Sequence, residues 1–454
     1  MQERPNTLDL ASDPDSLSAP FREAEKEAAR FRIGTESEKF ALRTDGSPVL
    51  YDEPNGILDL LKLLAARFGW EPVSEYPGGP ILALVRDGAS ITLEPGGQFE
   101  ISGAPFASLH ETHEEFITHR AELEVVGREL GIVFLGLGFH PFATRAELPW
   151  VPKLRYPIMR EYLPTRGVRA HDMMQRTSTV QANIDYSSEE DAMRKLKLAI
   201  RVQPLMTAIF ANSPFKEGKR GAYLSERADV WLHMDPDRSG MPAFAFTDAL
   251  SYQEYIDYAL DVPMFIVKRG AEIRQATHLR FRDYLRDGLG EARATMEDWV
   301  VHLATLFPEA RLKHIIEMRG LDAQPAELSV ASSAFFKGLF YDAVSMDELE
   351  RLIGGVDRSE LEAYRQRMPS EGLGALLAGK GTRDYAERLL EIADGGLERI
   401  DRAHASSCDA ERRYLEPIAA LIARGESPAS SLIAEAGDRE GEALRAFILE
   451  RARF

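Results

Sequence analysis

The chain has 454 residues, long enough to bury a large core without disulfides or a structural metal. Its 73 acidic and 55 basic residues leave a formal net charge of −18. Because such a surface repels nucleic acid and anionic lipid, the composition argues against both as partners and leaves carboxylates available for cations.

The compartment is predicted from the cysteine content and the first residues. The single cysteine, Cys408, cannot form a disulfide within one molecule. The opening stretch MQERPNTLDLASDPDS lacks the apolar core of a secretory leader, and no later apolar run is long enough to span a membrane. We therefore expect a cytosolic (cytoplasmic) protein that does not enter membranes.

Three regions follow one another along the chain. Residues 1–20 are polar and contain proline, which predicts a frayed tail. In the second region, residues 21–345, short strand candidates alternate with helices such as 57–68 between about 31 and 185, which predicts an α+β core. Further along, 188–212 and 251–260 are helical, and 213–250 is rich in Pro, Gly and Asp, a long irregular segment of the kind that lines sites. Residues 346–454 are almost entirely helix-forming, and we expect them to pack on the core.

The first predicted strand, FRIGTESEKFAL (31–42), carries two carboxylates on one face. Glu36 and Glu38 are two residues apart, so both point the same way with Cα atoms roughly 6.5 to 7 Å apart. That spacing suits neighbouring metal ions, and Lys39 falls on the opposite face. Taken alone, the segment is more simply explained as an exposed edge strand with solvated charges.

The next polar face belongs to a predicted hairpin, SITLEPGGQFEISG (90–103), with its turn at Pro-Gly-Gly. Alternation places Gln98 and Glu100 on one face and Phe99 on the other, and Glu94 lies just before the turn. A solvent-facing hairpin would look the same, so this segment alone does not establish a site.

Two later segments alternate in the same way. In QRTSTVQANIDYS (175–187), one face carries only uncharged polar side chains before Asp185, namely Thr177, Thr179, Gln181 and Asn183. A solvent-exposed strand more often carries Lys, Glu or Arg, so this face indicates a partly enclosed polar cavity. In LKHIIEMRG (312–320), Glu317 and Arg319 share a face and suit a metal and a phosphate. Brought together, these faces predict a concavity rich in oxygen ligands for Mg²⁺ bridging the phosphates of a nucleotide.

These segments, in this order, resemble the plant-type glutamate-cysteine ligases of plants and many bacteria. The matching stretches are FRIGTESEKF, LEPGGQFEISGAP, PKLRYPIMREYLP, MMQRTSTVQANIDY, ANSPFKEGK, DYALDVPMF and TLFPEARLKHIIEMRG. So many ordered matches are specific in combination, and they cover roughly residues 31–345. The region after about 345 matches weakly and contributes no functional residues to the prediction.

The resemblance implies a fold and a reaction. The fold would be glutamine-synthetase-like, with a curved, mostly antiparallel sheet around the active site and flanking helices, and 21–345 would be its catalytic region. ATP would phosphorylate the side-chain carboxylate of L-glutamate, and the amine of L-cysteine would displace phosphate to give γ-glutamylcysteine, the first step of glutathione synthesis. The reaction would need ATP and two or three Mg²⁺ ions but no covalent enzyme intermediate.

The resemblance also assigns roles to individual residues. The Mg²⁺ ligands would be Glu36, Glu38, Glu94, Glu100 and Glu317. Catalysis would involve Glu38, Glu317 and Arg319, whose guanidinium would neutralise the transferred phosphoryl group. The residues that contact ATP would be Gln181, Asn183 and Arg319. The amino-acid substrates would be held by Arg155 and Arg227 through their carboxylates, and their pockets would be lined by Met174, Thr179 and Phe265.

Some alternatives stay open. Phe265 stands where plant relatives carry Tyr, so a hydroxyl contact to substrate is missing, and another γ-glutamyl amine ligase on the same fold fits the sequence. A non-catalytic homologue that binds an amino acid or a nucleotide and regulates a partner also fits, although the retained carboxylates and Arg319 argue against it. Because Cys408 is the only cysteine, we expect no internal thiol switch of the kind found in plants. The oligomeric state cannot be read from the sequence.

Overall fold

The computed structural model describes residues 14–270, 272–403 and 410–454, so Cys408 lies outside the described residues. Within these ranges, the centre is a nine-stranded sheet in which all paired strands run antiparallel. Eight strands follow one path, in the order β14 (Ala310–Leu312), β15 (Ile316–Met318), β7 (Val180–Ile184), β1 (Ile33–Arg43), β5 (Phe99–Ser102), β4 (Ala89–Leu93), β3 (Ala83–Arg86) and β2 (Glu71–Val73). The remaining strand, β6 (Ile132–Leu135), pairs with the last residues of β1.

The strand β1 runs through the middle of the sheet and fixes which side chains reach each face. β7 pairs with its first residues, β5 with its middle and β6 with its end. Because neighbouring side chains alternate, Glu36 and Glu38 lie on one face, whereas Thr35 and Lys39 lie on the other. Lys39 is fully buried beside His119 of α4 (Leu109–Leu130), as expected from the sequence alternation.

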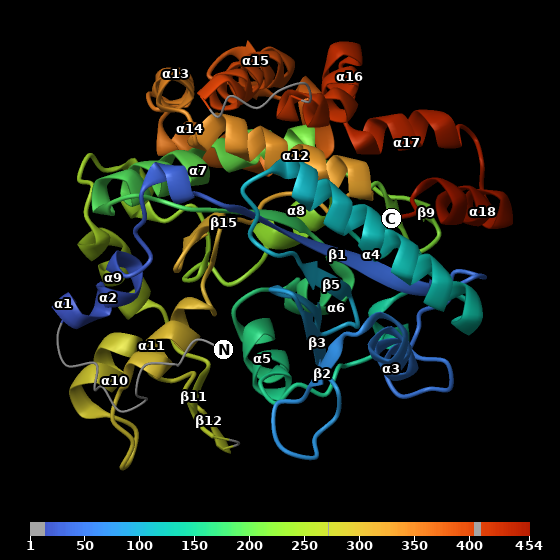
Figure 1. Cartoon of the computed structure of the whole chain (residues 1–454), viewed down its shortest axis with the longest axis horizontal. Helices are drawn as coiled ribbons and strands as arrows, with labels where there is room; N and C mark the ends of the chain where they lie inside the picture. Colours follow the sequence, from blue (N-terminus) through green and yellow to red (C-terminus); the bar gives the residue numbers. More distant parts are fainter. Residues whose placement is uncertain (1–13, 271, 404–409) are drawn as a thin grey trace.

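Helices cover the face of the sheet that carries Thr35 and Lys39 (Figure 1). The helices next to the sheet are α4, α7 (Glu189–Ile209) and α12 (Ala326–Phe340), and an outer layer consists of α13 (Ala343–Ile353), α15 (Thr382–Ala403) and α16 (Glu416–Arg424). The sequence of α12, AELSVASSAFFKGLF, is apolar or small on all sides, which suits a helix buried between two layers. Its Ser333 hydroxyl lies 2.6 Å from that of Thr35 on β1.

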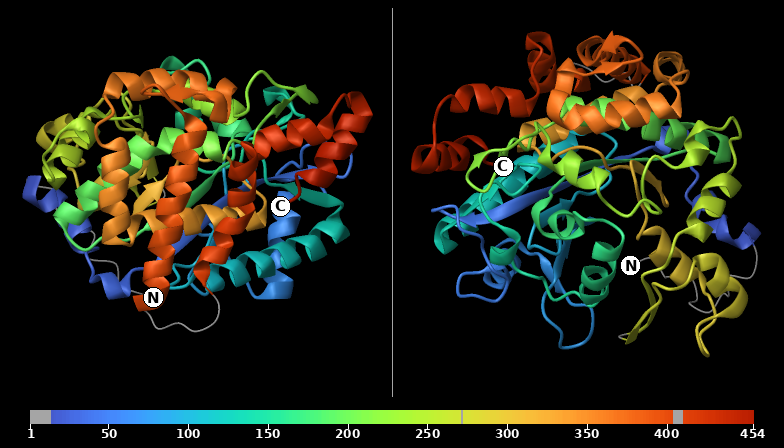
Figure 2. Two further views of the ribbon diagram at one scale, coloured as in Figure 1. Left: turned by 90° about the horizontal axis from the view of Figure 1, so that it is seen from above. Right: turned by 180° about the vertical axis from the view of Figure 1, so that it is seen from behind.

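The other face of the sheet is surrounded by short helices and a hairpin (Figures 1 and 2). These elements are α5 (Tyr156–Tyr162), α6 (Ala170–Arg176), α8 (Glu226–Leu232), α9 (Tyr252–Asp261), α10 (Phe281–Asp287), α11 (Met296–Leu303), β11 (Ile266–Arg269) and β12 (Glu272–Gln275). The segment 213–250, expected to be irregular, contains α8 and the short strands β8 (Phe215–Lys216), β9 (Lys219–Arg220) and β10 (Ser239–Gly240). Its serine-capped helix α8 is the part that reaches the site.

The remaining helices and strands lie at both ends of the chain and between the elements already named. They are α1 (Pro14–Leu17), α2 (Ala19–Arg22), α3 (Ile57–Phe68), β13 (Phe307–Pro308), α14 (Arg358–Glu371), β16 (Leu376–Leu377), β17 (Lys380–Gly381), α17 (Pro428–Ala436) and α18 (Gly441–Arg451). Part of the expected N-terminal tail is therefore helical, and the Leu17 side chain is fully buried. One contiguous apolar cluster extends from Leu17 to Ile422 and includes Phe454, so the C-terminal helices share the core of the preceding region. No helix among the described residues is both long and apolar enough to cross a membrane.

Candidate active site

The face of the sheet that carries Glu36 and Glu38 forms the floor of a cavity of about 470 Å³. Every predicted site residue except Asn183 lines this cavity, namely Glu36, Glu38, Glu94, Glu100, Arg155, Met174, Thr179, Gln181, Arg227, Phe265, Glu317 and Arg319. Asn183 lies on the same strand face as Gln181 but does not line the cavity. Its Nδ2 donates to Oε1 of Glu36, which does, at 2.7 Å. The four polar strand faces thus meet at one place.

Strand register brings the carboxylates together. Glu38 of β1 lies directly opposite Glu100 of β5, and Glu36 lies opposite Gln181 of β7. Directly opposed side chains in an antiparallel pair have Cβ atoms roughly 4.5 to 5.5 Å apart, and like charges in such pairs are destabilising. An acidic pair at this position weakens the free sheet and favours the binding of a cation.

The pKa values of the carboxylates on the cavity floor also show that negative charges are crowded there. Burial, with the charges of Glu317 and Glu100, raises the pKa of Glu36 to about 7. Burial, with Glu94 and Glu100, raises the pKa of Glu38 well above its usual range, and burial also raises the pKa of Glu94. The protein alone therefore does not compensate the negative charge of these carboxylates. Hard oxygen donors with uncompensated charge fit a divalent cation such as Mg²⁺.

Neighbouring donors hold Glu38 and Glu100 as well as Glu36. Glu38 Oε2 accepts from the Thr179 backbone N–H at 3.0 Å, and Glu100 accepts from the hydroxyls of Thr92 and Ser102. Among the described residues, no three acidic, histidine or cysteine side chains already surround a common metal position. The donor types fit a metal, and the side chains would have to turn toward a shared point to bind it.

A group of cations on the β14–β15 hairpin faces the acidic floor. Arg311 donates to both oxygens of Glu317 at 2.7 and 2.9 Å, Lys313 Nζ lies 2.5 Å from Glu317, and Arg319 also contacts this carboxylate. Burial opposes ionisation of Glu317, but the charges of Arg311, Lys313 and Arg319 hold its pKa well below the usual range. Sequence reasoning missed Arg311 and Lys313, because the pairing of Arg311 with Glu317 is set by the register of the hairpin.

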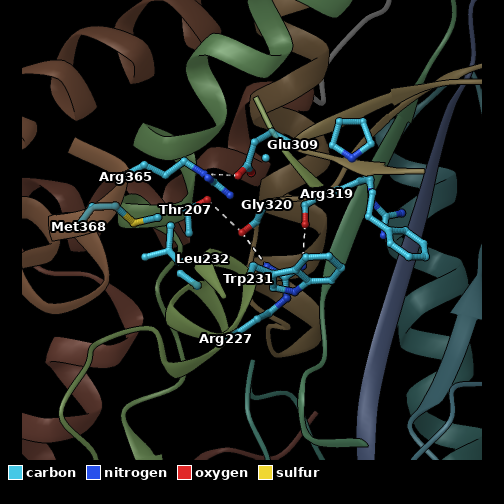
Figure 3. A pocket seen from close by; sticks show the side chains of 13 residues that line it. Thr207, Arg227, Trp231, Leu232, Glu309, Arg319, Gly320, Arg365 and Met368 are labelled. Carbon is cyan, nitrogen blue, oxygen red and sulfur yellow. Dashed lines mark hydrogen bonds and ion pairs between the residues drawn. The ribbon is translucent and has the colours of Figure 1, made fainter. Parts of the chain in front are cut away.

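The two predicted carboxylate-binding arginines enter from helices. Arg155 precedes α5, and its guanidinium lies 5.0 Å from the centre of the Tyr156 ring. Arg227, on α8, is buried and donates to the backbone oxygens of Arg319 and Gly320 at 2.7 and 2.9 Å (Figure 3). Arg227 therefore lines the cavity and also fixes the backbone that carries Arg319.

The start of α8 is tied to the segment after Arg319 by a buried carboxylate that the sequence did not reveal. Asp322 accepts hydrogen bonds from the Asn212 N–H at 2.7 Å, the Ser213 hydroxyl at 2.6 Å and the Ser225 hydroxyl at 2.8 Å. Ser225 is also the N-cap residue of α8. This network sets the position of Arg227 relative to the cavity.

The apolar part of the cavity wall contains Met174 and Phe265. The Phe265 ring contacts Tyr162 edge-on, with ring centres 5.8 Å apart, and the Arg238 guanidinium lies 4.0 Å from the centre of the Phe265 ring. Thr179 Oγ1 donates to the Leu321 oxygen at 2.7 Å. Its hydroxyl is thus used within the protein, while its backbone N–H holds Glu38.

The sequence is similar to that of a known protein family over most of its length. Residues 32–448 match the model of glutamate-cysteine ligase family 2. The chain belongs to this family. It is 42% identical over 412 residues to glutamate–cysteine ligase B, chloroplastic, of Oryza sativa subsp. japonica, covering 90% of this chain and 81% of the relative. It is 40% identical over 432 residues to the chloroplastic glutamate–cysteine ligase of Arabidopsis thaliana, covering 93% and 80%.

The fold of this family member also resembles a solved structure. Glutamate–cysteine ligase of Francisella tularensis, in complex with AMP, matches with a TM-score of 0.59 at 12% identity, over 93% of this chain and 88% of that chain. The predicted glutamine-synthetase-like α+β fold is confirmed, as is the resemblance to the plant-type ligases.

The predicted cytosolic location is wrong, because the plant relatives with about 40% identity are chloroplastic enzymes. That prediction depended on the single cysteine, which excludes an intramolecular disulfide but does not distinguish one reducing compartment from another.

Proposed function

We propose that the chain ligates the γ-carboxylate of L-glutamate to the amine of L-cysteine at the expense of ATP. The γ-carboxylate oxygen attacks the terminal phosphorus of ATP and releases ADP, the amine then attacks the acyl carbon, and phosphate leaves as γ-glutamylcysteine forms. The observation that carries the proposal is the cavity in which an acidic floor faces Arg311, Lys313 and Arg319. Phosphoryl transfer between anions needs both kinds of group in fixed positions.

The acidic floor is assigned to Mg²⁺. Glu36, Glu38, Glu94, Glu100 and Glu317 would hold two or three ions, which when bound would offset charge on the phosphates. Asn183 orients Glu36, and the Thr179 N–H orients Glu38. We assign catalytic roles to Glu38, Glu317 and Arg319 and nucleotide contacts to Gln181, Asn183 and Arg319, whose Nη1 lies 3.3 Å from Gln181 Oε1.

The helical side of the cavity is assigned to the amino acids. Arg155 and Arg227 lie at the wall with guanidinium groups suited to substrate carboxylates. The pocket that they share is lined by Met174, Thr179 and Phe265. Phe265 offers an aromatic face but no hydroxyl, so substrate recognition there depends on shape and apolar contact rather than on a hydrogen bond.

Product formation tests this function. Purified protein is incubated with ATP, Mg²⁺, L-glutamate and L-cysteine, and γ-glutamylcysteine is measured by mass spectrometry. We expect product from the wild type and from Glu114→Gln, whose side chain is 79% exposed, but none from Glu36→Gln/Glu38→Gln. EDTA should stop the reaction and excess Mg²⁺ should restore it.

Other outcomes separate the alternatives. Product from the double variant would remove the metal assignment on β1 and keep the ligase activity. If the wild type releases phosphate only with a different amine, the chain is another γ-glutamyl ligase. If it binds ATP and turns over no amine, it is a non-catalytic regulator.

A further inference from the structure

A buried ion pair links the C-terminal helical region to the cavity wall. Arg365, on α14, is only 8% exposed, and its Nε donates to Glu309 Oε1 at 2.6 Å. Glu309 immediately precedes β14, and its side chain is 13% exposed. A second acidic group, Glu362, lies 3.5 Å from Arg365 Nη1 on the same helix. Removing Arg365 would leave the Glu309 carboxylate without its close partner at a site with little water.

Glu309 in turn holds the backbone of Arg319. The backbone N–H of Arg319 donates to the backbone oxygen of Glu309 at 3.0 Å, and the backbone N–H of Glu309 donates to the backbone oxygen of Gly240 at 2.9 Å. Arg319 lies one residue beyond β15, so its hydrogen bond to Glu309 continues the β14–β15 pairing past Met318. On its other side, the Arg319 oxygen accepts from Arg227.

The surroundings of this linkage leave little room for adjustment. Arg365, Glu309, Arg319 and Arg227 line a small cavity of about 30 Å³ (Figure 3). Arg227 and Arg319 also line the larger cavity. A Cβ atom on Gly320 would lie 2.7 Å from Thr207 Oγ1 and 3.1 Å from Glu309 Oε2. The Glu309 carboxylate thus lies close to the Gly320 backbone, so a shift of this side chain would disturb the backbone next to Arg319.

We propose that Arg365 is a positioning residue for phosphoryl transfer. It fixes Glu309, and through Glu309 it sets the backbone of Arg319, from which the guanidinium reaches the transferring phosphoryl group. The inference rests on the proposed function of Arg319 and gives the C-terminal helical region an indirect part in the reaction, through Glu309. Because displacement of a charge-stabilising group by about 1 Å costs roughly 100-fold in rate, a modest loosening of this linkage is measurable.

The kinetic test compares four variants with the wild type. In Arg365→Met, we expect kcat to fall roughly 10- to 100-fold while KM for glutamate and cysteine changes less than about threefold, since Arg319 acts mainly in the transition state. Arg365→Lys should recover part of the loss by restoring the charge. Arg365→Met/Glu309→Gln should be no slower than Arg365→Met, because both changes break one interaction. Arg367→Met, on the exposed side of the same helix, should match the wild type.

Hydrogen exchange tests the linkage without using activity. In Arg365→Met, amides of peptides covering 305–321 should exchange faster than in the wild type. If the wild type makes no γ-glutamylcysteine, the proposed function fails, and exchange still decides whether Arg365 holds the Arg319 segment. Wild-type kcat in Arg365→Met, a double variant slower than Arg365→Met, or faster exchange confined to 358–371 would overturn the inference.

Discussion

The carboxylates of the cavity floor work against the stability of the ligand-free protein. Glu36 and Glu38 are half-buried near other acids, and the acidic pair formed by Glu38 and Glu100 lies directly opposed on neighbouring strands. A sheet selected for stability alone would carry small or β-branched residues here. We propose that a cation bound in the cavity offsets this cost.

This imbalance predicts how stability depends on pH. The pKa of Glu36 rises from 4.5 in the unfolded chain to about 7 in the folded protein, so between these values the folded state keeps a proton that the unfolded state loses. Stability should therefore fall as pH rises through this window, on the order of 3 kcal/mol for this group. Urea unfolding in EDTA at pH 5 and pH 8 should show the fall in the wild type and a smaller one in Glu36→Gln.

Two controls make this prediction specific. The exposed Glu23→Gln should keep the wild-type dependence on pH. Mg²⁺ at pH 8 should stabilise the wild type more than Glu36→Gln, because binding to the folded state adds to its stability. Equal pH dependence in the wild type and Glu36→Gln would show that Glu36 does not carry the effect.

At the scale of elements, the polar strand faces could be predicted because alternation along a strand is a local property. That alternation placed Glu36, Glu100, Gln181 and Glu317 on the face that the structure turns to the cavity. It could not show which face of a neighbouring element lies opposite. Lys313 was missed for this reason, since the hairpin turn decides that it reaches Glu317.

Residues that act through distant partners carry no local pattern at all. The partners of Asp322 include Asn212, which is 110 positions away, and Arg365 and Glu309 are 56 positions apart. Sequence reasoning also assigned no function to the region that contains Arg365. Such contacts arise from the packing of α8 and α14 against the cavity wall, which only the assembled fold defines.

The β4–β5 turn positions Glu94 through its fit against α6. Gly97 has φ of +84°, and a Cβ on Gly96 would lie 2.4 Å from the Gln175 oxygen. The Gln98 side chain bonds back to the Gly96 N–H and across to the Thr177 oxygen, which joins the turn to the start of the polar face of β7.

We therefore expect Gly96→Ala to push the turn away from α6. Overpacking of this kind costs about 1 to 3 kcal/mol, and the Mg²⁺ concentration needed for half-maximal activity should rise because Glu94 moves. Urea unfolding and Mg²⁺ titration of activity measure the two effects. Gly355→Ala, where nothing lies within 4 Å of the added carbon, should change neither. Unchanged stability in Gly96→Ala would show that the turn can relax without cost.

At the scale of the whole molecule, the apolar core does not divide near residue 345, where the sequence analysis placed a boundary between regions, and the family match itself continues to residue 448. Gly338 of α12 and Gly396 of α15 allow the two helices to touch, since a Cβ on Gly396 would lie 2.0 Å from the Gly338 oxygen. Leu389 and Leu397 of α15 belong to the same buried cluster as the residues beneath the sheet. We propose that residues 346–454 are a region of one cooperative unit rather than an independent domain.

The distribution of tryptophan allows a direct test. All four tryptophans, Trp70, Trp150, Trp231 and Trp299, precede residue 346, whereas the described C-terminal region is mainly helical. Tryptophan fluorescence and far-ultraviolet circular dichroism should give coincident transitions in urea, because one core unfolds at once. Two separated midpoints would show that the C-terminal helices unfold on their own.

The central position of β1 also limits how this protein can evolve. A slip of one residue would bring Ser37 and Lys39 to the cavity floor and turn Glu36 and Glu38 toward the helices α4 and α12. Deletion of one codon just before Glu36 would thus replace two anions with a hydroxyl and an ammonium group, reversing the polarity of the site, and insertion of one codon just before Thr35 would place the hydroxyls of Thr35 and Ser37 at the same positions. Length variation among descendants should accumulate in loops such as 44–56, while β1 itself changes only by substitution.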